Sequence, residues 1–272
     1  MTAATISYRD TRDGLTLLER HWPASDPRAT VIIVHGLGEH CGRYEHVGAA
    51  LVEAGYDTVA FDLRSFGRSG GRTRSYVDSF DQFLDDLEDQ IATAASDQRP
   101  LVVLGHSMGG LIAAAYATSS RPQPDAYVVS APPLGVEVPR WQRIMSKLLT
   151  RWAPRIAIPN DIDSETLSRD VAVQQGYDAD RLVQHQVTVR LGAEMFRAMD
   201  DTVAALDRIN TPMLVLHGAE DPLVPPRFSA SLGGVPSVRR ELLPGLRHEI
   251  FNEPEQLEVV ARVVDWMNET VG

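Results

Sequence analysis

The chain has 272 residues, 43% of them hydrophobic and 23% charged, which is typical of a globular protein long enough for a sizeable core. Its net charge of −11 disfavours nucleic acid as a partner, because a phosphate backbone would repel it. The single cysteine, Cys41, excludes an internal disulfide and fits a reducing compartment. Residues 1–10 show no signal-peptide pattern and no apolar run reaches membrane-spanning length, so we expect a cytoplasmic protein.

Apolar runs of strand length alternate with amphipathic helical patterns through most of the chain. Two early runs, at 5–9 and 15–19, predict an antiparallel entry into a sheet. The alternation that follows predicts an α/β fold, with a mostly parallel central sheet flanked by helices. Further strands are expected at 31–34, 58–61, 101–104, 126–129, 213–216 and 239–243, and helices at about 43–54, 79–91, 110–116, after 226 and 254–270.

The alternation stops between residues 131–133 and 209–212. The intervening stretch has the pattern of helices and loops rather than of further sheet strands. We therefore predict one domain, 1–272, with an inserted and mainly helical cap at 133–208. Such a cap would lie over the carboxyl ends of the strands, where folds of this class bind ligands.

The first predicted helix of the cap, at 141–152, has a tryptophan at each end and a continuous apolar stripe. Four basic residues and no acidic ones occupy its other face. One interpretation is an interfacial anchor that docks on a lipid surface and brings the protein into peripheral contact with a membrane. The other is a cap helix that buries its stripe on the body, with its basic side chains in solvent. The basic residues are Arg140, Arg143, Lys147 and Arg151.

A candidate nucleophile, Ser107, stands in the pentapeptide Gly-His-Ser-Met-Gly at 105–109. An apolar strand pattern precedes it and a helix of small residues follows, which is the context that gives this motif its meaning. The glycines allow strand and helix to approach closely, so the serine hydroxyl stands exposed on a strained turn at a helix N-terminus. An ordinary turn serine is the alternative.

A nucleophilic serine needs a base and an acid behind the base. His248 lies in a turn before the closing helix, from which an imidazole can reach across the top of the sheet. Asp221 follows a buried strand and precedes a proline, which favours it over Glu220 as the orienting acid. The alternative for Asp221 is a turn-forming acid without a catalytic role. The side chain of His106, beside the nucleophile, is expected to point back into the scaffold.

The oxyanion hole needs two backbone N–H groups. One belongs to the residue after the nucleophile, Met108. The other is expected from Leu37, which lies between two glycines in the loop after an early strand. The order Ser, Asp, His along the chain is the order found in α/β-hydrolases.

Four blocks together resemble the monoacylglycerol lipases of the α/β-hydrolase superfamily, over nearly the whole chain. The resemblance implies hydrolysis of the single ester of a monoacylglycerol to glycerol and a fatty acid. It also implies that Glu39 and Arg43 lie near a small polar pocket for glycerol; without it, they would be charges at a helix entry. The blocks are HGLGEHCGRY at 35–44, GHSMGG at 105–110, GAED at 218–221 and HEIFNE at 248–253.

Two positions depart from the family pattern. Ser65 stands where family members usually carry a glycine, so a positive φ there would strain the serine or require a remodelled loop. Arg181 stands where relatives often have proline. Neither residue belongs to the predicted chemistry, but both affect the expected shape of the pocket.

These observations predict a serine ester hydrolase that acts on a small lipid substrate and needs no metal or organic cofactor. Activity should fall on acidification as His248 is protonated, near the ordinary histidine pKa of about 6.5. A broad carboxylesterase or a lysophospholipase with the same triad is the nearest alternative. A binding protein that kept the fold is the alternative of another class. The sequence leaves the oligomeric state open.

Overall fold

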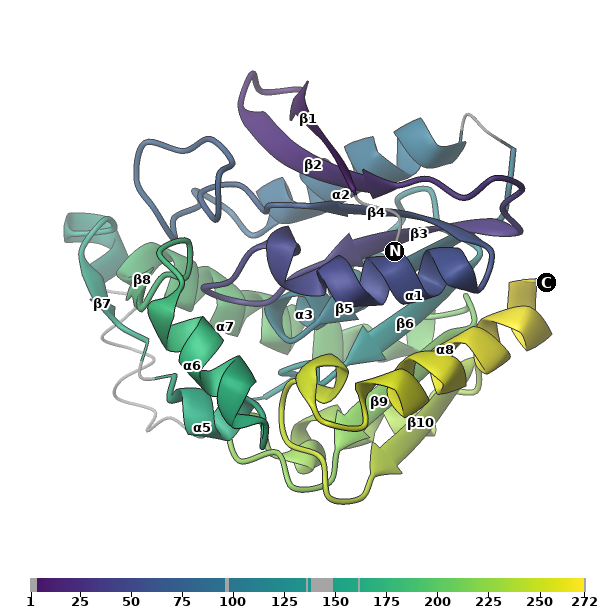
Figure 1. Ribbon diagram of the computed structural model, residues 1–272. Coiled ribbons are helices and arrows are strands. Elements are labelled where there is room, and N and C mark those ends of the chain that lie inside the picture. The colour runs from purple at the N-terminus through teal and green to yellow at the C-terminus, as the bar shows by residue number, and fades with distance from the viewer. Residues whose placement is uncertain (1–3, 96–97, 136, 138–148, 161, 272) are drawn as a thin grey trace.

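The computed structural model describes residues 4–95, 98–135, 137, 149–160 and 162–271, and an eight-stranded sheet forms its centre (Figure 1). In chain order the strands are β1 (Thr5–Asp10), β2 (Thr16–Trp22), β3 (Ala29–Val34), β4 (Tyr56–Phe61), β5 (Leu101–His106), β6 (Ala126–Ser130), β9 (Met213–Gly218) and β10 (Val238–Leu243). Their spatial order is β1-β2-β4-β3-β5-β6-β9-β10. The β1–β2 and β2–β4 pairs are antiparallel and all others are parallel, so the predicted entry and the α/β class are confirmed.

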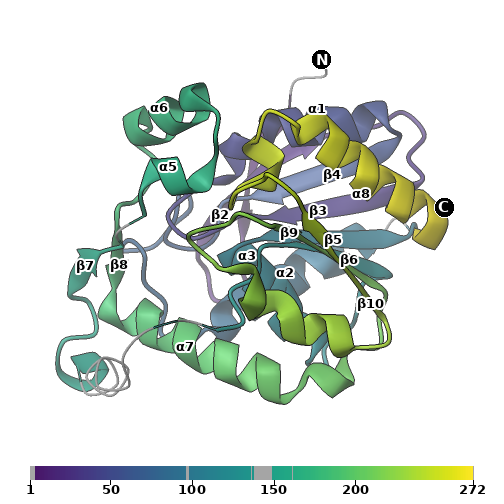
Figure 2. The same cartoon turned by 90° about the horizontal axis from the view of Figure 1, so that it is seen from below.

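Helices cover both faces of the sheet, as the apolar strands require. The central strand β3 is buried throughout, because its successive side chains enter opposite cores. Val31 and Ile33 belong to the core under α1 and α8, whereas Ile32 and Val34 belong to the core under α2, α3 and α7. Figure 2 shows the two layers on opposite sides of the sheet. The bounds are α1 Glu45–Glu53, α2 Asp81–Ala94, α3 Met108–Ala117, α7 Val189–Ala204 and α8 Gln256–Val271.

The junction of β5 with α3 is tightly packed. A side chain at Gly109 would collide with the carbonyl oxygen of Val34, and one at Gly105 with the carbonyl oxygen of Gly109. Only glycine allows helix and strand to lie this close. The turn between them therefore holds Ser107 above the carboxyl ends of β3 and β5.

The chain leaves the main sheet between β6 and β9, which are neighbours in that sheet. The excursion contains α5, α6 and α7 together with a two-stranded antiparallel sheet, which the predicted helices and loops did not include. The two strands have three residues each and are largely exposed, so no apolar alternation marked them in the sequence. The new elements are β7 (Ala157–Pro159), α5 (Ser164–Leu167), α6 (Val171–Ala179) and β8 (Gln186–Thr188).

The last helix of this excursion, α7, packs against the body rather than above it. Leu191, Ala198 and Met199 all belong to the main core that α2 and α3 share. The elements that extend away from the sheet are therefore β7, α5, α6 and β8, on the left of Figure 1. The predicted helix at 141–152 lies outside the described residues except for its last turn, 149–152.

Ser65 has the positive φ that a glycine would be expected to supply, at +64°. The conformation is held because the Ser65 hydroxyl donates to the Tyr76 carbonyl at 2.8 Å and accepts from the Tyr76 N–H at 3.0 Å. The loop thus keeps its shape with a serine in a strained backbone conformation, which costs about 1–3 kcal/mol of conformational free energy. Arg181 is exposed in the turn after α6.

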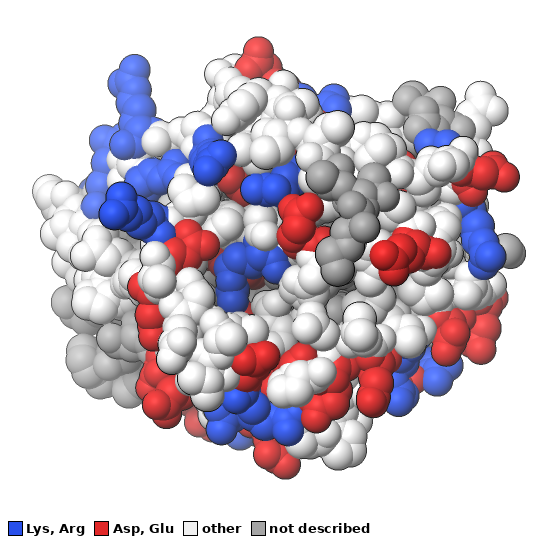
Figure 3. All heavy atoms as spheres, viewed as in Figure 1, with Lys and Arg blue, Asp and Glu red and all other residues white. Residues whose placement is uncertain are grey.

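Acidic and basic side chains are interspersed over the face seen in Figure 3, and Lys and Arg gather toward the side on which β7 and β8 lie. None of the helices in the described part of the chain is long and apolar enough to cross a membrane.

Cys41 is buried, as its small apolar character favours.

Candidate active site

Ser107 occupies the turn between β5 and α3, with φ 52° and ψ −117°. This backbone conformation is strained for a residue other than glycine. It is fixed because the Ser107 N–H donates to the Ser130 carbonyl at 2.9 Å, and because α3 begins immediately afterwards. Met108 is the first residue of α3 and is buried. The serine is therefore presented on a rigid strand–turn–helix unit, the arrangement that the motif predicts.

Asp221 and His248 are brought together from the loops after β9 and β10. His248 Nδ1 lies 2.7 Å from Asp221 Oδ2, and both residues are buried. The other carboxylate oxygen, Oδ1, accepts the N–H groups of Leu223 and Val224 at 2.9 Å each. Asp221 thus forms a turn with one oxygen and contacts the imidazole with the other. A hydrogen on Nδ1 directed at the carboxylate leaves Nε2 of His248 free to accept a proton.

A second histidine shares the carboxylate of Asp221, which the sequence analysis did not anticipate. His217 Nε2 lies 3.1 Å from Asp221 Oδ2 and 2.7 Å from the Val224 carbonyl. Because both partners are acceptors, Nε2 of His217 carries a hydrogen. This contact helps to keep Asp221 ionised: burial opposes its ionisation, but the charge of His248 and hydrogen bonds from both histidines lower its pKa far below the usual range.

Ser107 and His248 line one small cavity of about 20 Å³, together with Leu37 and Glu39. Leu37 follows β3 directly, in the loop that packs against the nucleophile turn: a Cβ at Gly36 would lie 3.2 Å from Cβ of Ser107. The excursion between β6 and β9 completes the wall. The remaining lining residues are Gly36, Ile162, Leu167, Tyr177, Leu223 and Glu249.

Glu39 and Arg43 form a buried charged cluster with Glu249, the residue after His248. Arg43 Nη1 donates to Glu39 Oε2 at 2.9 Å, and Arg43 Nη2 donates to Glu249 Oε2 at 2.7 Å. Burial opposes ionisation of Glu39, but the charge of Arg43 outweighs it, and the pKa of Glu39 falls to about 2. Glu39 reaches the cavity wall, whereas Arg43 lies behind it. Neither is a solvated charge at a helix entry.

Tyr177, on α6, is a site residue that the sequence analysis did not assign. It is buried, and its ring lies against the Arg43 guanidinium, 5.0 Å from ring centroid to Cζ. Its hydroxyl has no hydrogen-bond partner among the described residues, although it lines the same cavity as Ser107. A buried hydroxyl without a partner is unfavourable unless a ligand supplies one. No local sequence pattern indicated a role for this tyrosine, because its contact with Arg43 joins residues that are far apart in the chain.

His106 is buried, as expected for a side chain that points into the scaffold, and its Nδ1 lies 3.1 Å from the Ser130 hydroxyl. Its ring also lies 4.9 Å from the ring of His248, centroid to centroid. Burial and the nearby His248 lower its pKa to about 4, so it is neutral at pH 7. His46, at the start of α1, is partly buried, with Nε2 2.7 Å from the Phe251 carbonyl.

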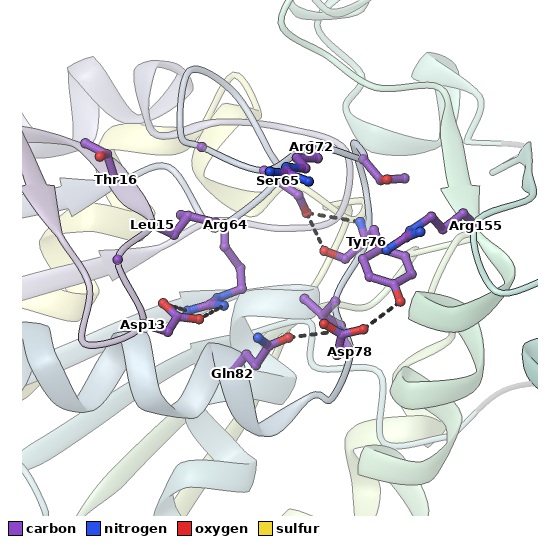
Figure 4. A pocket seen from close by; sticks show the side chains of 15 residues that line it. Asp13, Leu15, Thr16, Arg64, Ser65, Arg72, Tyr76, Asp78, Gln82 and Arg155 are labelled. Atoms are coloured by element: carbon purple, nitrogen blue, oxygen red, sulfur yellow. Dashed lines mark hydrogen bonds and ion pairs between the residues drawn. The ribbon is translucent and has the colours of Figure 1, made fainter.

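A more open hollow of about 480 Å³ lies between the loop after β4 and the residues preceding β7 (Figure 4). None of the predicted catalytic residues lines it, and much of its charge is neutralised within its own wall. Arg64 donates to Asp13 at 2.8 Å, and the hydroxyl of Tyr76 donates to Asp78 at 2.6 Å. The smaller cavity at Ser107 is therefore the candidate active site. Within the described residues, no cluster of three or more His, Cys, Asp or Glu side chains is arranged to hold a metal ion.

Comparison with known proteins gives a consistent result. Residues 25–255 match the family model described as "Serine aminopeptidase, S33". The chain is 36% identical to a monoacylglycerol lipase of Mycolicibacterium smegmatis, over 93% of both chains, and 30% identical to phospholipase YtpA of Bacillus subtilis, over 88% of this chain and 94% of that one.

Among solved structures, the crystal structure of Paleococcus ferrophilus monoacylglycerol lipase superimposes with a TM-score of 0.84 at 29% identity, covering 94% of this chain and 99% of that one. The agreement thus extends from the sequence to the arrangement of the sheet and its helices. The chain belongs to this serine hydrolase family and, within the α/β-hydrolases, to the monoacylglycerol lipases, and it is a serine ester hydrolase.

Proposed function

We propose that this chain hydrolyses the ester of monoacylglycerols to glycerol and a free fatty acid, through an acyl-enzyme intermediate on Ser107. The observation that carries the proposal is the cavity at Ser107, where His248 and an unpartnered tyrosine hydroxyl line the same wall. Asp221 fixes the imidazole from behind at 2.7 Å. The names of the relatives support a lipid ester as the substrate class.

The reaction proceeds by acyl transfer in two steps. The Ser107 oxygen bonds to the acyl carbon while His248 Nε2 takes the serine proton, and the Leu37 and Met108 N–H groups stabilise the oxyanion. When the tetrahedral intermediate collapses, His248 gives its proton to the glycerol oxygen and glycerol leaves. Water then attacks the acyl-enzyme with His248 as the base, which releases the fatty acid and restores the serine.

Glycerol recognition is proposed for the polar side of the cavity. Tyr177, whose buried hydroxyl has no partner among the described residues, and Glu39 both line a cavity of about 20 Å³, which is too small for an acyl chain. Arg43 supports both, through its ion pair with Glu39 and its contact with the tyrosine ring. The acyl chain is then expected on the other side of Ser107, under the proposed cap at 133–208.

A lysophospholipase is the second candidate, because a phospholipase is among the relatives at 30% identity. The decisive experiment measures fatty acid release from 1-monooleoylglycerol, lysophosphatidylcholine and a short p-nitrophenyl ester, with wild type and Ser107→Ala. Turnover of the monoacylglycerol above the other two, lost in Ser107→Ala, is the expected result. Preference for lysophosphatidylcholine would establish the second candidate, and activity confined to the short ester would contradict both lipid substrates.

Contact with a lipid surface is proposed for the region that precedes and includes β7. Leu149, Trp152 and Ile156 are exposed, and Trp152 retains 82% of its accessible surface. The exposed Arg151 and Arg155 are interspersed with them. Apolar side chains among cations suit the interface of a membrane that contains anionic lipids.

A further inference from the structure

The backbone around Gly36, which precedes the Leu37 N–H of the proposed oxyanion hole, is held on both sides by side chains. The Gly36 N–H donates to Glu39 Oε1 at 2.6 Å. The Gly36 carbonyl accepts from His35 Nδ1 at 2.8 Å, while His35 Nε2 accepts from the Leu63 N–H at 2.9 Å. Burial lowers the pKa of His35, so its single ring hydrogen is the one on Nδ1.

These two hydrogen bonds determine where the Leu37 N–H points. In a planar trans peptide the carbonyl and the following N–H point in opposite directions. The His35 bond to the Gly36 carbonyl therefore fixes the direction of the Leu37 N–H. The Glu39 bond to the Gly36 N–H holds the preceding peptide, between His35 and Gly36, so that the two peptides do not rotate together. Gly36 lies directly beside the nucleophile, so a rotation at this point would turn the N–H away from the reacting carbonyl oxygen.

Glu39 is itself held in place by groups outside the cavity. Its Oε1 also accepts from the Tyr44 hydroxyl at 2.8 Å, and its Oε2 accepts from Arg43 at 2.9 Å. Arg43 is in turn paired with Glu249, next to His248. The pairing with Arg43 matters because an unneutralised carboxylate near the developing oxyanion would oppose its formation.

We propose that Glu39 is a positioning residue, whose carboxylate holds the His35–Gly36 peptide and so, together with the His35 bond to the Gly36 carbonyl, keeps the following peptide in the orientation that presents the Leu37 N–H to the acyl oxygen. This inference rests on the proposed function, since it assigns Leu37 to the oxyanion hole. It extends that function because Glu39 acts through the backbone on every ester, whatever its alcohol. A role in glycerol binding alone would act only on glycerol esters.

The test compares Glu39→Ala and Glu39→Gln on 1-monooleoylglycerol and on p-nitrophenyl butyrate. Glutamine keeps an oxygen that can accept the Gly36 N–H, whereas alanine removes it. We expect kcat in Glu39→Ala to fall about ten- to a hundred-fold on both esters, somewhat less than the loss of an entire oxyanion donor. Glu39→Gln should lose less activity than Glu39→Ala, because its oxygen can still accept from Gly36, although an amide cannot replace the ion pair with Arg43. Glu53→Ala, on the exposed face of α1, is the matched control.

A trifluoromethyl ketone, whose adduct with the serine places an oxyanion in the hole, provides the second measurement. Its Ki should rise in Glu39→Ala in proportion to the loss of kcat/KM, with active serines counted by fluorophosphonate labelling. A loss confined to monooleoylglycerol, or an unchanged Ki, would overturn the positioning role and leave the lipase proposal intact. If wild type does not hydrolyse monooleoylglycerol but Glu39→Ala slows p-nitrophenyl butyrate, the lipase proposal fails and the positioning role stands.

Discussion

The loops at the carboxyl ends of the strands and the excursion between β6 and β9 meet at the cavity, and they are built differently. The proposed acid and base on the loops are fixed by a buried contact: Asp221 contacts two histidines, one of them His248, and two backbone N–H groups. The excursion contributes mainly apolar surface, with a small core of its own around Leu167, Tyr177 and Val183. It is joined to the loops by hydrogen bonds at several places, among them His40 Nε2 to Asp180 Oδ2 at 2.8 Å and the Arg169 N–H to Glu253 Oε2 at 2.9 Å.

This difference suggests a division of roles. Groups that must be positioned for proton transfer are held by loops of the main sheet, whereas the groups proposed to select the substrate belong to the inserted segment. Substitutions in the loops should therefore lower the rate on all esters alike. Substitutions in the excursion should change the choice of substrate or of surface and leave the chemistry intact.

The largest effect is expected from Asp221→Asn, which replaces the carboxylate that orients His248. An amide at this position favours the wrong imidazole tautomer, so kcat should fall about ten-thousand-fold on every ester. Glu220→Gln, the exposed neighbour, is the control and should stay within about twofold of wild type. Rates on monooleoylglycerol and p-nitrophenyl butyrate measure both. A small loss in Asp221→Asn would mean that His248 is oriented by another group.

The pH dependence of kcat/KM is the next largest effect. Burial disfavours protonation of His248, but the charge of Asp221 outweighs it and raises the pKa of His248 above its ordinary value of 6.5. Because the base must be neutral, activity is lost as pH falls through this raised pKa, at higher pH than an unperturbed histidine predicts. Below the midpoint the rate should fall about tenfold per pH unit. An acid limb centred below 6 would contradict the assignment.

Tyr177→Phe tests the excursion as the source of selectivity. Loss of one hydroxyl that binds glycerol should lower kcat/KM for 1-monooleoylglycerol about three- to tenfold, the usual size of one hydrogen bond. The rate on p-nitrophenyl butyrate should not change. Tyr76→Phe, in the hollow of Figure 4, is the matched control. Equal losses on both esters would show that Tyr177 acts on the chemistry, and the division of roles would fail.

The smallest effect is expected from Trp152→Ser, which should lower binding to vesicles of phosphatidylcholine and phosphatidylglycerol about threefold to tenfold in a sedimentation assay. Its exposure means that stability and the rate on p-nitrophenyl butyrate should be preserved. Leu257→Ser, an exposed apolar residue on α8 at the other side of the molecule, is the control (Figure 1). Equal binding of both variants and wild type to the vesicles would contradict the proposed lipid contact.

Much of the site was accessible from the sequence because its signals are local. A strand pattern, two glycines and a helix pattern surround Ser107 within a few residues, and a strand followed by Asp-Pro surrounds Asp221. Tyr177 and the second contact of Asp221 were missed for the opposite reason. A tyrosine inside an amphipathic helix gives no sign that its hydroxyl will lack a partner, since that depends on which residues pack around it. The contact of the His106 ring with that of His248, 142 residues later, likewise depends on the packing.

The sequence by itself determined the strands, the nucleophile turn and the order of the chemical groups, because these depend on backbone preferences over short stretches. Only the tertiary structure decided which groups meet. Arg43 and Glu249, separated by 206 positions, form one ion pair beside the cavity, and Ser65 keeps a conformation that its residue type disfavours through bonds to Tyr76. The physical reason is that hydrogen bonds and ion pairs act over a few ångströms in space. Their partners are chosen only when the packed sheet brings distant loops to the same edge.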